Sequence, residues 1–253
     1  MSRLGIVGTD HQVPGYRITP TFAVDENSQL QGFLNFTCES PIRRDKDEDI
    51  NYTTTPIEQK NVFLWLAHLE RIDAESRSNP DRTDMAIFDR GGDIAQIFLE
   101  RDKRFTSTEL IIRAKKNRVV SGEEKYDGES EKVIEHLRNS KHVGCIEIMI
   151  RPKSKNKNAK KKYRKRKDGE KKKISDYEKR PATLRIHYDE VEINVPNHLV
   201  PLYGAKTIKL NAVLAREYNP PAGQNRVEWL IWTTLPINSL AEAVGVVKWY
   251  SRR

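Results

Sequence analysis

Hydrophobic and polar positions in the first part of the chain follow two different periods. The apolar stretches 18–24 and 30–36 flank a polar segment, which is typical of two strands joined by a turn. Apolar residues then recur every three or four positions between Val62 and Ile72, as one face of a helix requires, and Pro56 suits the first turn of that helix. The pattern therefore predicts a hairpin followed by a helix.

A shorter alternation of elements follows this helix. The apolar stretch 85–88 leads into a polar turn, and an apolar helical face begins at Ile94. A second short apolar stretch, 110–112, comes next and runs into basic residues. Strand, helix and strand at this spacing predict a βαβ unit in an α/β sheet.

The hydrophobic period changes to two after residue 119. Alternation of this kind is typical of half-buried antiparallel strands. The predicted strands of this part of the chain are 145–151, 190–195, 208–215 and 227–233. Ser239 and Glu242 then have the spacing of a capping box, which predicts a last helix.

These patterns predict an α/β protein with an inserted β-rich subdomain. Residues 1–118 would form the first part of the core, and residues 206–253 its closing strands and the start of a helix. Residues 119–205 would form the insertion, with a lysine-rich loop, 152–181, that we expect to be solvated and disordered. The last helix has no stop signal at Arg253, so we expect the natural helix to continue past it.

Basic residues are concentrated in one segment. The stretch 153–173 holds 13 Lys or Arg residues and two acidic residues, a net charge of +11, whereas the whole chain has a net charge of +9. The rest of the chain therefore carries −2. Such a segment indicates one contact zone for a polyanion, although a solvated surface loop has the same composition. The candidate DNA contacts in it are Lys160, Lys161, Lys162 and Arg164.

Other kinds of chemistry are not indicated. The chain has no GxGxxG, Walker, GxSxG or HExxH motif. Cys38 and Cys145 form no CxxC pair, so the sequence predicts neither a disulfide framework nor a zinc site and favours a reducing cytoplasm. The longest apolar run, 62–67, is far shorter than the ~20 residues of a membrane-spanning helix, so no membrane partner is expected.

Asp89 is the strongest candidate for chemistry. It follows the predicted strand 85–88, and open α/β sheets place functional groups at the carboxyl ends of their strands. A carboxylate there can bind Mg²⁺, or it can cap the helix that follows, and both interpretations stay open. Asp93 is interpreted as a first-turn acid that the helix dipole favours.

Two further groups are candidates for contacts with nucleic acid. A basic cluster follows the strand 110–112, although a polar strand exit has the same composition; its members are Arg113, Lys115, Lys116 and Arg118. Trp229 and Trp232 are an odd number of positions apart, so they face opposite sides of a regular strand. At least one should be core, and the other is either core or free to stack on a base.

Together these residues resemble the insertion-sequence-four family of DDE cut-and-paste transposases. The resemblance covers most of the chain and rests on four pieces in a fixed order. They are 20–24 with 30–34, the motif FDRGGD at 88–93, the strand end RAKKNR at 113–118, and the stretch from EWL at 228–230 to WYSRR at 249–253.

The resemblance implies a ribonuclease H-like core, incomplete in this chain, and DNA transposition by metal-dependent phosphodiester cleavage and strand transfer. Asp89 would be the second catalytic acid and a ligand of Mg²⁺. Tyr250 and Arg253 would contact phosphates of the transposon ends, and Trp229 would stack on a flipped base. The implied partners are transposon-end DNA and a second copy or a full-length transposase, and the expected location is the cytoplasm, in association with the nucleoid.

The chain departs from the family pattern at the other two acids. The first catalytic aspartate would lie before residue 1 and the glutamate beyond Arg253, while Gly91 stands where the family often has a glutamate. One carboxylate cannot hold two metal ions in a fixed geometry, so we expect a fragment that is inactive alone and does not bind Mg²⁺ stably. The alternatives are a non-catalytic DNA-binding regulator or inhibitor of a full-length transposase, and an unrelated RNA-binding protein that uses the lysine-rich segment.

Overall fold

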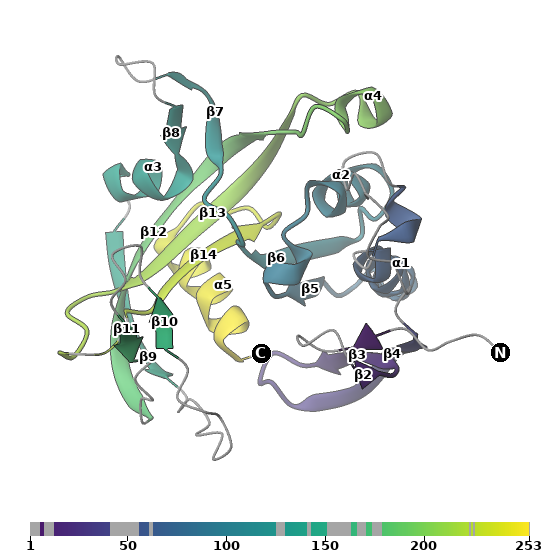
Figure 1. The fold of residues 1–253 in the computed structure, drawn as a ribbon, viewed down its shortest axis with the longest axis horizontal. Coiled ribbons are helices and arrows are strands. Elements are labelled where there is room, and N and C mark those ends of the chain that lie inside the picture. The colour runs from purple at the N-terminus through teal and green to yellow at the C-terminus, as the bar shows by residue number, and fades with distance from the viewer. Residues whose placement is uncertain are drawn as a thin grey trace. The chain divides into compact units, whose positions relative to one another are not determined.

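The structure is a computed structural model in which the chain divides into two compact units. The first unit comprises Met1–Lys116, Glu192–Lys209 and Arg252–Arg253, and the second Asn117–Val191 and Leu210–Ser251. The structure describes residues 6–7, 13–40, 56–60, 63–124, 130–140, 143–150, 163–165, 171–173, 179–222, 224 and 226–252. Figure 1 labels the elements of both units.

The first unit contains the predicted hairpin. Strands β3 (Arg17–Val24) and β4 (Leu30–Glu39) pair antiparallel, and the Asp25 carboxylate accepts the backbone N–H groups of Asn27 and Gln29 in the turn. A further short pair precedes it, β1 (Ile6–Val7) with β2 (Val13–Pro14). The hairpin prediction is confirmed. Large apolar side chains on it remain exposed, namely Ile18, Phe22, Val24, Leu30, Phe33 and Phe36.

Helix α1 (Phe63–Arg77) is the predicted helix and packs beside the hairpin. It buries Leu66, Leu69 and Ile72, whereas Val62 lies outside the described residues. Pro56 caps a separate 3₁₀ turn, η1 (Ile57–Gln59). His68 joins α1 to both strands of the hairpin, because its two ring nitrogens are hydrogen-bonded to the hydroxyls of Thr21 and Thr37.

The environment of His68 predicts a pH-dependent stability. Burial lowers the pKa of His68 below its usual 6.5, and Glu39 offsets this only in part. Between the lowered pKa and 6.5 the unfolded chain binds more protons than the folded one, so stability should fall as pH drops below about 6.5. Urea unfolding of the wild type and of His68→Asn at several pH values measures this. The difference between the two should change with pH in that window, and a constant difference would contradict the assignment.

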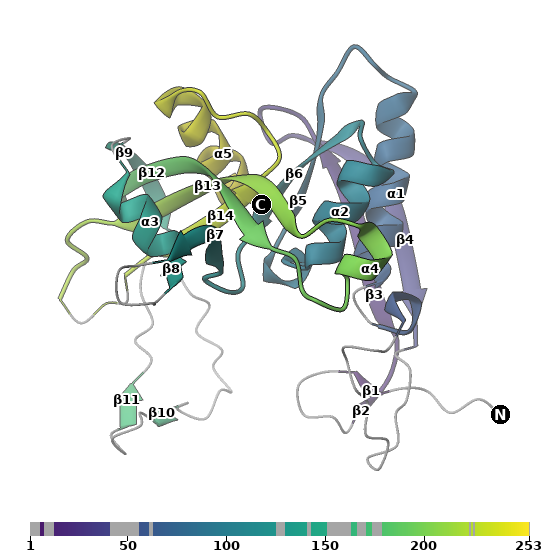
Figure 2. The same cartoon turned by 90° about the horizontal axis from the view of Figure 1, so that it is seen from above.

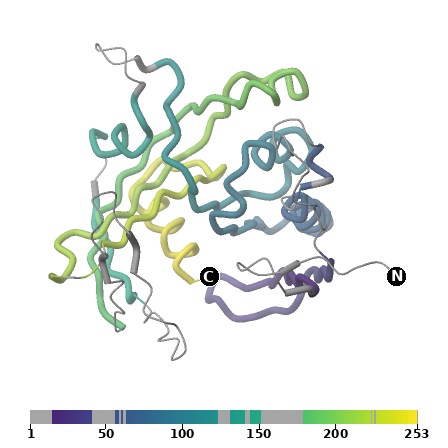
Figure 3. Tube along the Cα trace, in the orientation of Figure 1, coloured from purple at the N-terminus to yellow at the C-terminus, as the bar shows by residue number. Residues whose placement is uncertain are grey.

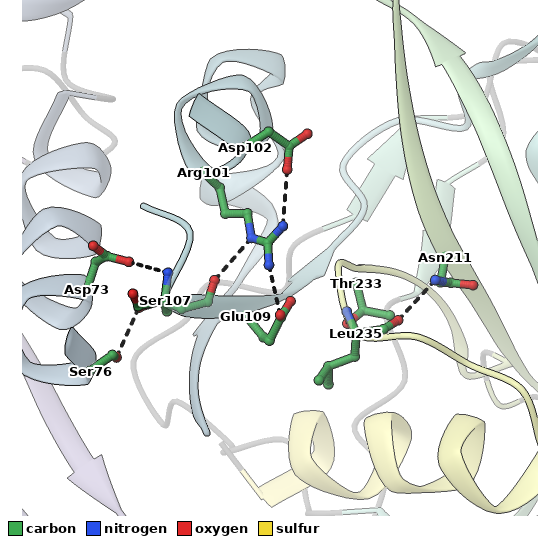
Figure 4. A network of polar contacts seen from close by, with 10 residues as sticks. Asp73, Ser76, Arg101, Asp102, Ser107, Glu109, Asn211, Thr233 and Leu235 are labelled. Carbon is green, nitrogen blue, oxygen red and sulfur yellow. Dashed lines mark hydrogen bonds and ion pairs between the residues drawn. The ribbon is translucent and has the colours of Figure 1, made fainter. Parts of the chain in front are cut away.

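The predicted βαβ unit is also confirmed. Strands β5 (Asp84–Phe88) and β6 (Thr108–Arg113) pair in parallel, and helix α2 (Ala95–Lys103) connects them, a path that the tube in Figure 3 follows. The buried carboxylate of Asp73 on α1 accepts the Ser107 N–H at 2.8 Å, which fixes the start of β6 against α1 (Figure 4). The Arg101 guanidinium likewise ties α2 to β6 through Glu109, at 2.8 Å.

A short helix completes the first unit. Helix α4 (Val200–Tyr203), which the sequence did not predict, ends at Gly204 in the left-handed region, where glycine carries no Cβ penalty. The Tyr203 hydroxyl donates to Glu100 on α2 at 2.6 Å. Burial and this carboxylate raise the pKa of Tyr203 to about 12, so the hydroxyl keeps its proton and its role as a donor.

A larger sheet forms the second unit, in the order β14-β13-β12-β7-β8, with β9 also paired to β12. The register of β9 with β12 and of β13 with β14 is antiparallel, as the period of two predicted. The bounds are β7 (Val119–Glu124), β8 (Ser130–Lys132), β9 (Val143–Ile150), β12 (Arg180–Asn194), β13 (Thr207–Glu217) and β14 (Glu228–Thr233).

Two helices lie on opposite faces of this sheet, as Figure 2 shows. Helix α3 (Val133–Asn139), which the sequence did not predict, is fixed on one face by the hydrogen bond from His136 to Asp189. Helix α5 (Leu240–Arg252) covers the other face, where Leu240 reaches Gly144. The predicted capping box is present at its start.

The capping box and the connection to β14 use short polar contacts. The Ser239 hydroxyl accepts the Glu242 N–H at 3.3 Å, and the Glu242 carboxylate accepts the Ser239 N–H at 3.1 Å. In the loop before the helix, the Thr233 hydroxyl accepts the Leu235 N–H, and the Asn211 amide donates to the Leu235 carbonyl (Figure 4). These contacts fix where α5 begins.

The lysine-rich segment is only partly described. Strands β10 (Tyr163–Lys165) and β11 (Lys171–Lys173) pair antiparallel, which the prediction of a disordered loop did not include. Residues 179–181 are also described, and β12 begins there; the rest of 152–181 lies outside the described residues.

The protein is therefore a mixed α/β protein, as predicted, with five α-helices among its described residues. In the described part of the chain, no helix is both long and apolar enough to cross a membrane.

Candidate functional site

The carboxyl ends of β5 and β6 meet at one edge of their parallel pair. Phe88 is the register partner of Ile112, so the next residue on each strand, Asp89 and Arg113, lies at the same edge. Asp89 directly follows β5, and Arg113 is the last residue of β6. Both strands contain buried residues, and their packing fixes the backbone positions of Asp89 and Arg113. The structure thus brings together two of the predicted site residues within the first unit.

Asp89 caps the short 3₁₀ helix η2 (Arg90–Gly92). Its Oδ1 accepts the Gly91 N–H at 2.8 Å, and its backbone is extended, as is usual for a cap. The capping interpretation is confirmed. A carboxylate has about four lone-pair sites, and Asp89 is exposed, so a cap can also bind a cation. Metal binding by Asp89 stays a prediction.

The structure gives a physical reason for glycine at position 91. A Cβ at this position would lie 2.9 Å from a carbon of the Trp65 ring, which is closer than Cβ atoms approach other side chains in proteins. Trp65 in turn packs edge-on against Phe88, with 5.1 Å between ring centroids. A glutamate at 91 would therefore require Trp65 to move.

The interpretation of Asp93 as a first-turn acid was wrong. Asp93 precedes α2, whose first turn has no acid, and its side chain is buried. Its Oδ2 accepts the backbone N–H groups of Lys115 and Lys116, at 2.6 and 3.2 Å. Asp93 thus fixes the loop that carries two of the basic candidates, and the spacing of 22 residues gives no local signal of this contact.

Replacing Asp93 by alanine should lower the free energy of unfolding by about 2–3 kcal/mol, because two N–H groups lose a charged acceptor in a buried place. Asp93→Asn keeps one acceptor oxygen and should cost less. Urea denaturation of the two variants measures both effects. Equal losses in the two variants would show that the hydrogen bonds are not the cause.

The basic residues of this edge have no ion-pair partner among the residues that the structure describes. Arg113 is half-buried, and Lys115 and Lys116 are exposed. None of the three side chains forms an ion pair with a residue that the structure describes. Arg118, the fourth member of the predicted cluster, belongs to the second unit and is half-buried. Three unpaired cations and one exposed carboxylate therefore flank the carboxyl edge of β5 and β6.

Two aromatic candidates meet in the second unit. The half-buried Trp229 on β14 packs edge-on against Tyr250 on α5, with 5.4 Å between ring centroids. Tyr250 is buried, so a contact of its hydroxyl with a phosphate stays a prediction. Trp232 is fully buried, which confirms that at least one of the two tryptophans is core. Base stacking by Trp229 stays a prediction.

Other predicted site residues cannot be placed. Lys160, Lys161, Lys162 and Arg253 lie outside the described residues. For Arg164 only the backbone is described, within β10.

The residues at the edge of β5 and β6 do not form a metal centre by themselves. Across the described parts of the chain, no group of three or more His, Cys, Asp or Glu residues could hold a metal ion. Asp89 is the exposed carboxylate of this edge, and Asp93 is occupied by two backbone N–H groups. Mg²⁺ is usually held by one or two carboxylates together with waters and substrate phosphates, and this edge offers a single exposed carboxylate, so we derive no step through Mg²⁺.

Sequence reasoning missed a polar pocket in the second unit. Its arginines come from α3, β12, β13 and the segment before β14, at positions far apart in the chain. The only local signal was arginine or histidine on alternate positions of β12, at Arg185 and His187.

No family model matches the chain.

Proposed function

We propose that this chain is part of a DNA transposase of the insertion-sequence-four type, and that it contacts DNA at the carboxyl edge of β5 and β6. The observation that best supports this is the set of three cations beside the exposed Asp89 that form no ion pair with any described residue. Cations without carboxylate partners are available to phosphates, whose neutralisation dominates the affinity of proteins for DNA.

The strands of the first unit are compatible with a ribonuclease H-like core. It has an antiparallel hairpin, β3–β4, and a parallel pair, β5–β6, and within the described residues the hairpin is a two-stranded sheet that does not pair with β5 or β6. In the family that the sequence resembles, a strand with the first catalytic acid lies between such pairs. On this proposal, the exposed apolar residues of the hairpin would pack in the complete core.

The residues of the edge would have distinct roles. Arg113, Lys115 and Lys116 would bind phosphates, and Asp93 would hold the backbone of the two lysines in place. Asp89 would contribute one carboxylate to a metal site that needs further acids. Phosphate contacts position a duplex without reading its sequence, so this edge predicts affinity rather than specificity.

The salt dependence of DNA binding tests the proposal. Fluorescence anisotropy with a labelled duplex should give an affinity that falls steeply with salt concentration. A variant with Arg113, Lys115 and Lys116 changed to glutamine should bind more weakly, and its plot of log affinity against log salt should be flatter by about 2–3, because each lost phosphate contact removes about 0.9.

A matched variant controls for net charge. Arg71, Arg82 and Arg104 have exposed side chains in the same unit and form surface ion pairs, which contribute little to stability. Changing these three to glutamine removes the same charge and should leave the slope unchanged. If both triple variants reduce the slope equally, binding reflects overall charge and the proposed interface is wrong.

A further inference from the structure

A pocket of about 280 Å³ opens on the second unit. It lies on the α3 face of the sheet, where Arg185 and His187 of β12 stand beside Arg216 of β13. The remaining lining residues are Arg138, Leu214, Glu217, Tyr218, Asn219 and Arg226. The pocket thus holds four arginines. Like charges on one concave surface repel one another, so this arrangement does not stabilise the fold by itself.

The charges around the pocket do not balance. Arg138 and Arg216 share one carboxylate, that of Glu228, at 3.4 and 3.0 Å. Glu217 is occupied by Arg180, which lies outside the lining. With Arg185 and Arg226 included, five arginines face two glutamates, an excess of three positive charges.

Two arginines of the pocket are available to a ligand. Arg185 and Arg226 are exposed, and neither forms an ion pair with a described residue. Arg185 lies over the Tyr218 ring, 4.0 Å from its centroid, and Tyr218 is 49% exposed. Both residues line the pocket, and aromatic rings and guanidinium planes are the groups on which nucleic-acid bases stack.

One buried polar atom of the pocket offers a further contact for a ligand. His187 Nδ1 is buried and has no hydrogen-bond partner among the described residues. Burial lowers the pKa of His187; a hydrogen bond to the Leu137 backbone raises it, and Arg185, Arg138 and Arg216 lower it further. The ring is therefore neutral at pH 7, and Nδ1 can accept a proton or a hydrogen bond from a bound anion.

The chemistry of these groups favours phosphate over other anions. A guanidinium presents a planar fork of donors that matches phosphate oxygens in pairs. A phosphomonoester carries a charge of about −1.5 to −2 near pH 7, and its remaining proton, with a pKa of about 6, can be shared with a neutral imidazole nitrogen. A carboxylate has less charge, and sulfate has no such proton.

We propose that this pocket binds a phosphomonoester of a nucleotide, with the phosphate among Arg138, Arg216 and His187 and the base near Arg185 and Tyr218. The site is separate from the edge of β5 and β6 and does not depend on the transposase proposal. A free mononucleotide and the phosphorylated end of a DNA strand present the same chemical group.

Isothermal titration calorimetry of the whole chain at constant ionic strength tests this. The probes are inorganic phosphate, thymidine 5′-monophosphate, and tetrathymidylate with and without a 5′-phosphate. Tighter binding of the monophosphate than of the phosphorylated tetranucleotide supports a free nucleotide as ligand, and the reverse supports a DNA end. If the two tetranucleotides bind equally and neither small probe binds, the proposal is overturned.

Two variants locate the binding. Arg185→Gln with Arg226→Gln removes two exposed guanidinium groups, and with them two of the pocket's excess positive charges and the cation beside Tyr218, so it should weaken binding of the preferred probe at least tenfold. Lys179→Gln with Lys248→Gln removes the same charge from exposed positions of the same unit and should change affinity less than twofold. Equal effects of the two pairs would overturn the proposal. If circular dichroism shows that the arginine variant is unfolded, the wild-type chain provides the test. Equal binding of tetrathymidylate with and without a 5′-phosphate, and no binding of the small probes, would then overturn the proposal.

Discussion

Replacing Trp232 by alanine is expected to lower the free energy of unfolding of the second unit by about 3–5 kcal/mol. The side chain is among the largest that are fully buried, on β14 opposite Ala212 of β13. Its removal deletes apolar contacts and leaves a cavity that a sheet held by neighbouring strands can collapse only in part. Urea unfolding followed by hydrogen exchange of the β13 and β14 amides reports on this unit without relying on tryptophan fluorescence.

A milder variant separates volume from polarity. Trp232 Nε1 is buried without a hydrogen-bond partner among the described residues, so Trp232→Phe loses volume but no hydrogen bond and should cost clearly less than the alanine variant. Trp229→Ala, on the opposite face and only half-buried, should also cost less. A loss below about 1 kcal/mol for Trp232→Ala would mean that this residue is not part of a packed core.

Removing the Glu217 carboxylate should destabilise the same unit by about 3–5 kcal/mol. Its two oxygens accept the Arg180 guanidinium at 2.5 and 3.1 Å and the Val227 N–H at 3.0 Å. Burial raises the pKa of Glu217, but the hydrogen bonds from Arg180 and Val227 outweigh it, so the pKa lies below the usual value. Glu217→Ala removes the carboxylate that is ion-paired with the largely buried Arg180, and the loss of this compensation for a buried charge accounts for most of the cost.

The double variant provides the control for this pair. Replacing Arg180 with methionine and Glu217 with leucine removes both charges, and apolar replacements of a buried ion pair are often neutral or stabilising. Stability should therefore recover most of the loss seen in Glu217→Ala. If the double variant is as unstable as the single one, the cost comes from lost packing and not from the unpaired arginine.

Local patterns predicted most of the regular elements. The hairpin, the βαβ unit and the capping box each depend on residues close together in sequence, such as Ser239 and Glu242, whose contacts formed as their spacing indicated. Helix α3 was missed because it has only seven residues, with two of them, Val133 and Leu137, buried. A segment of this length has too few apolar positions to show the helical period of hydrophobic residues.

The candidate site was predicted less completely, because its contacts are not local. Asp89 and Arg113 follow recognisable strands, so their meeting at one edge follows from the parallel pairing. Asp93, in contrast, accepts hydrogen bonds from a loop 22 residues away, which no local pattern encodes. The arginine pocket is assembled from α3, β12, β13 and the segment before β14, and it likewise depends on the packing of the sheet.

The central claim is that DNA lies against the carboxyl edge of β5 and β6. Ultraviolet cross-linking of the wild-type chain to a bromouracil-substituted duplex, followed by peptide mass spectrometry, tests it directly. The account predicts that the attached peptides include the residues from Arg113 to Lys116. Cross-links confined to other parts of the chain, such as 153–173 alone, would contradict it.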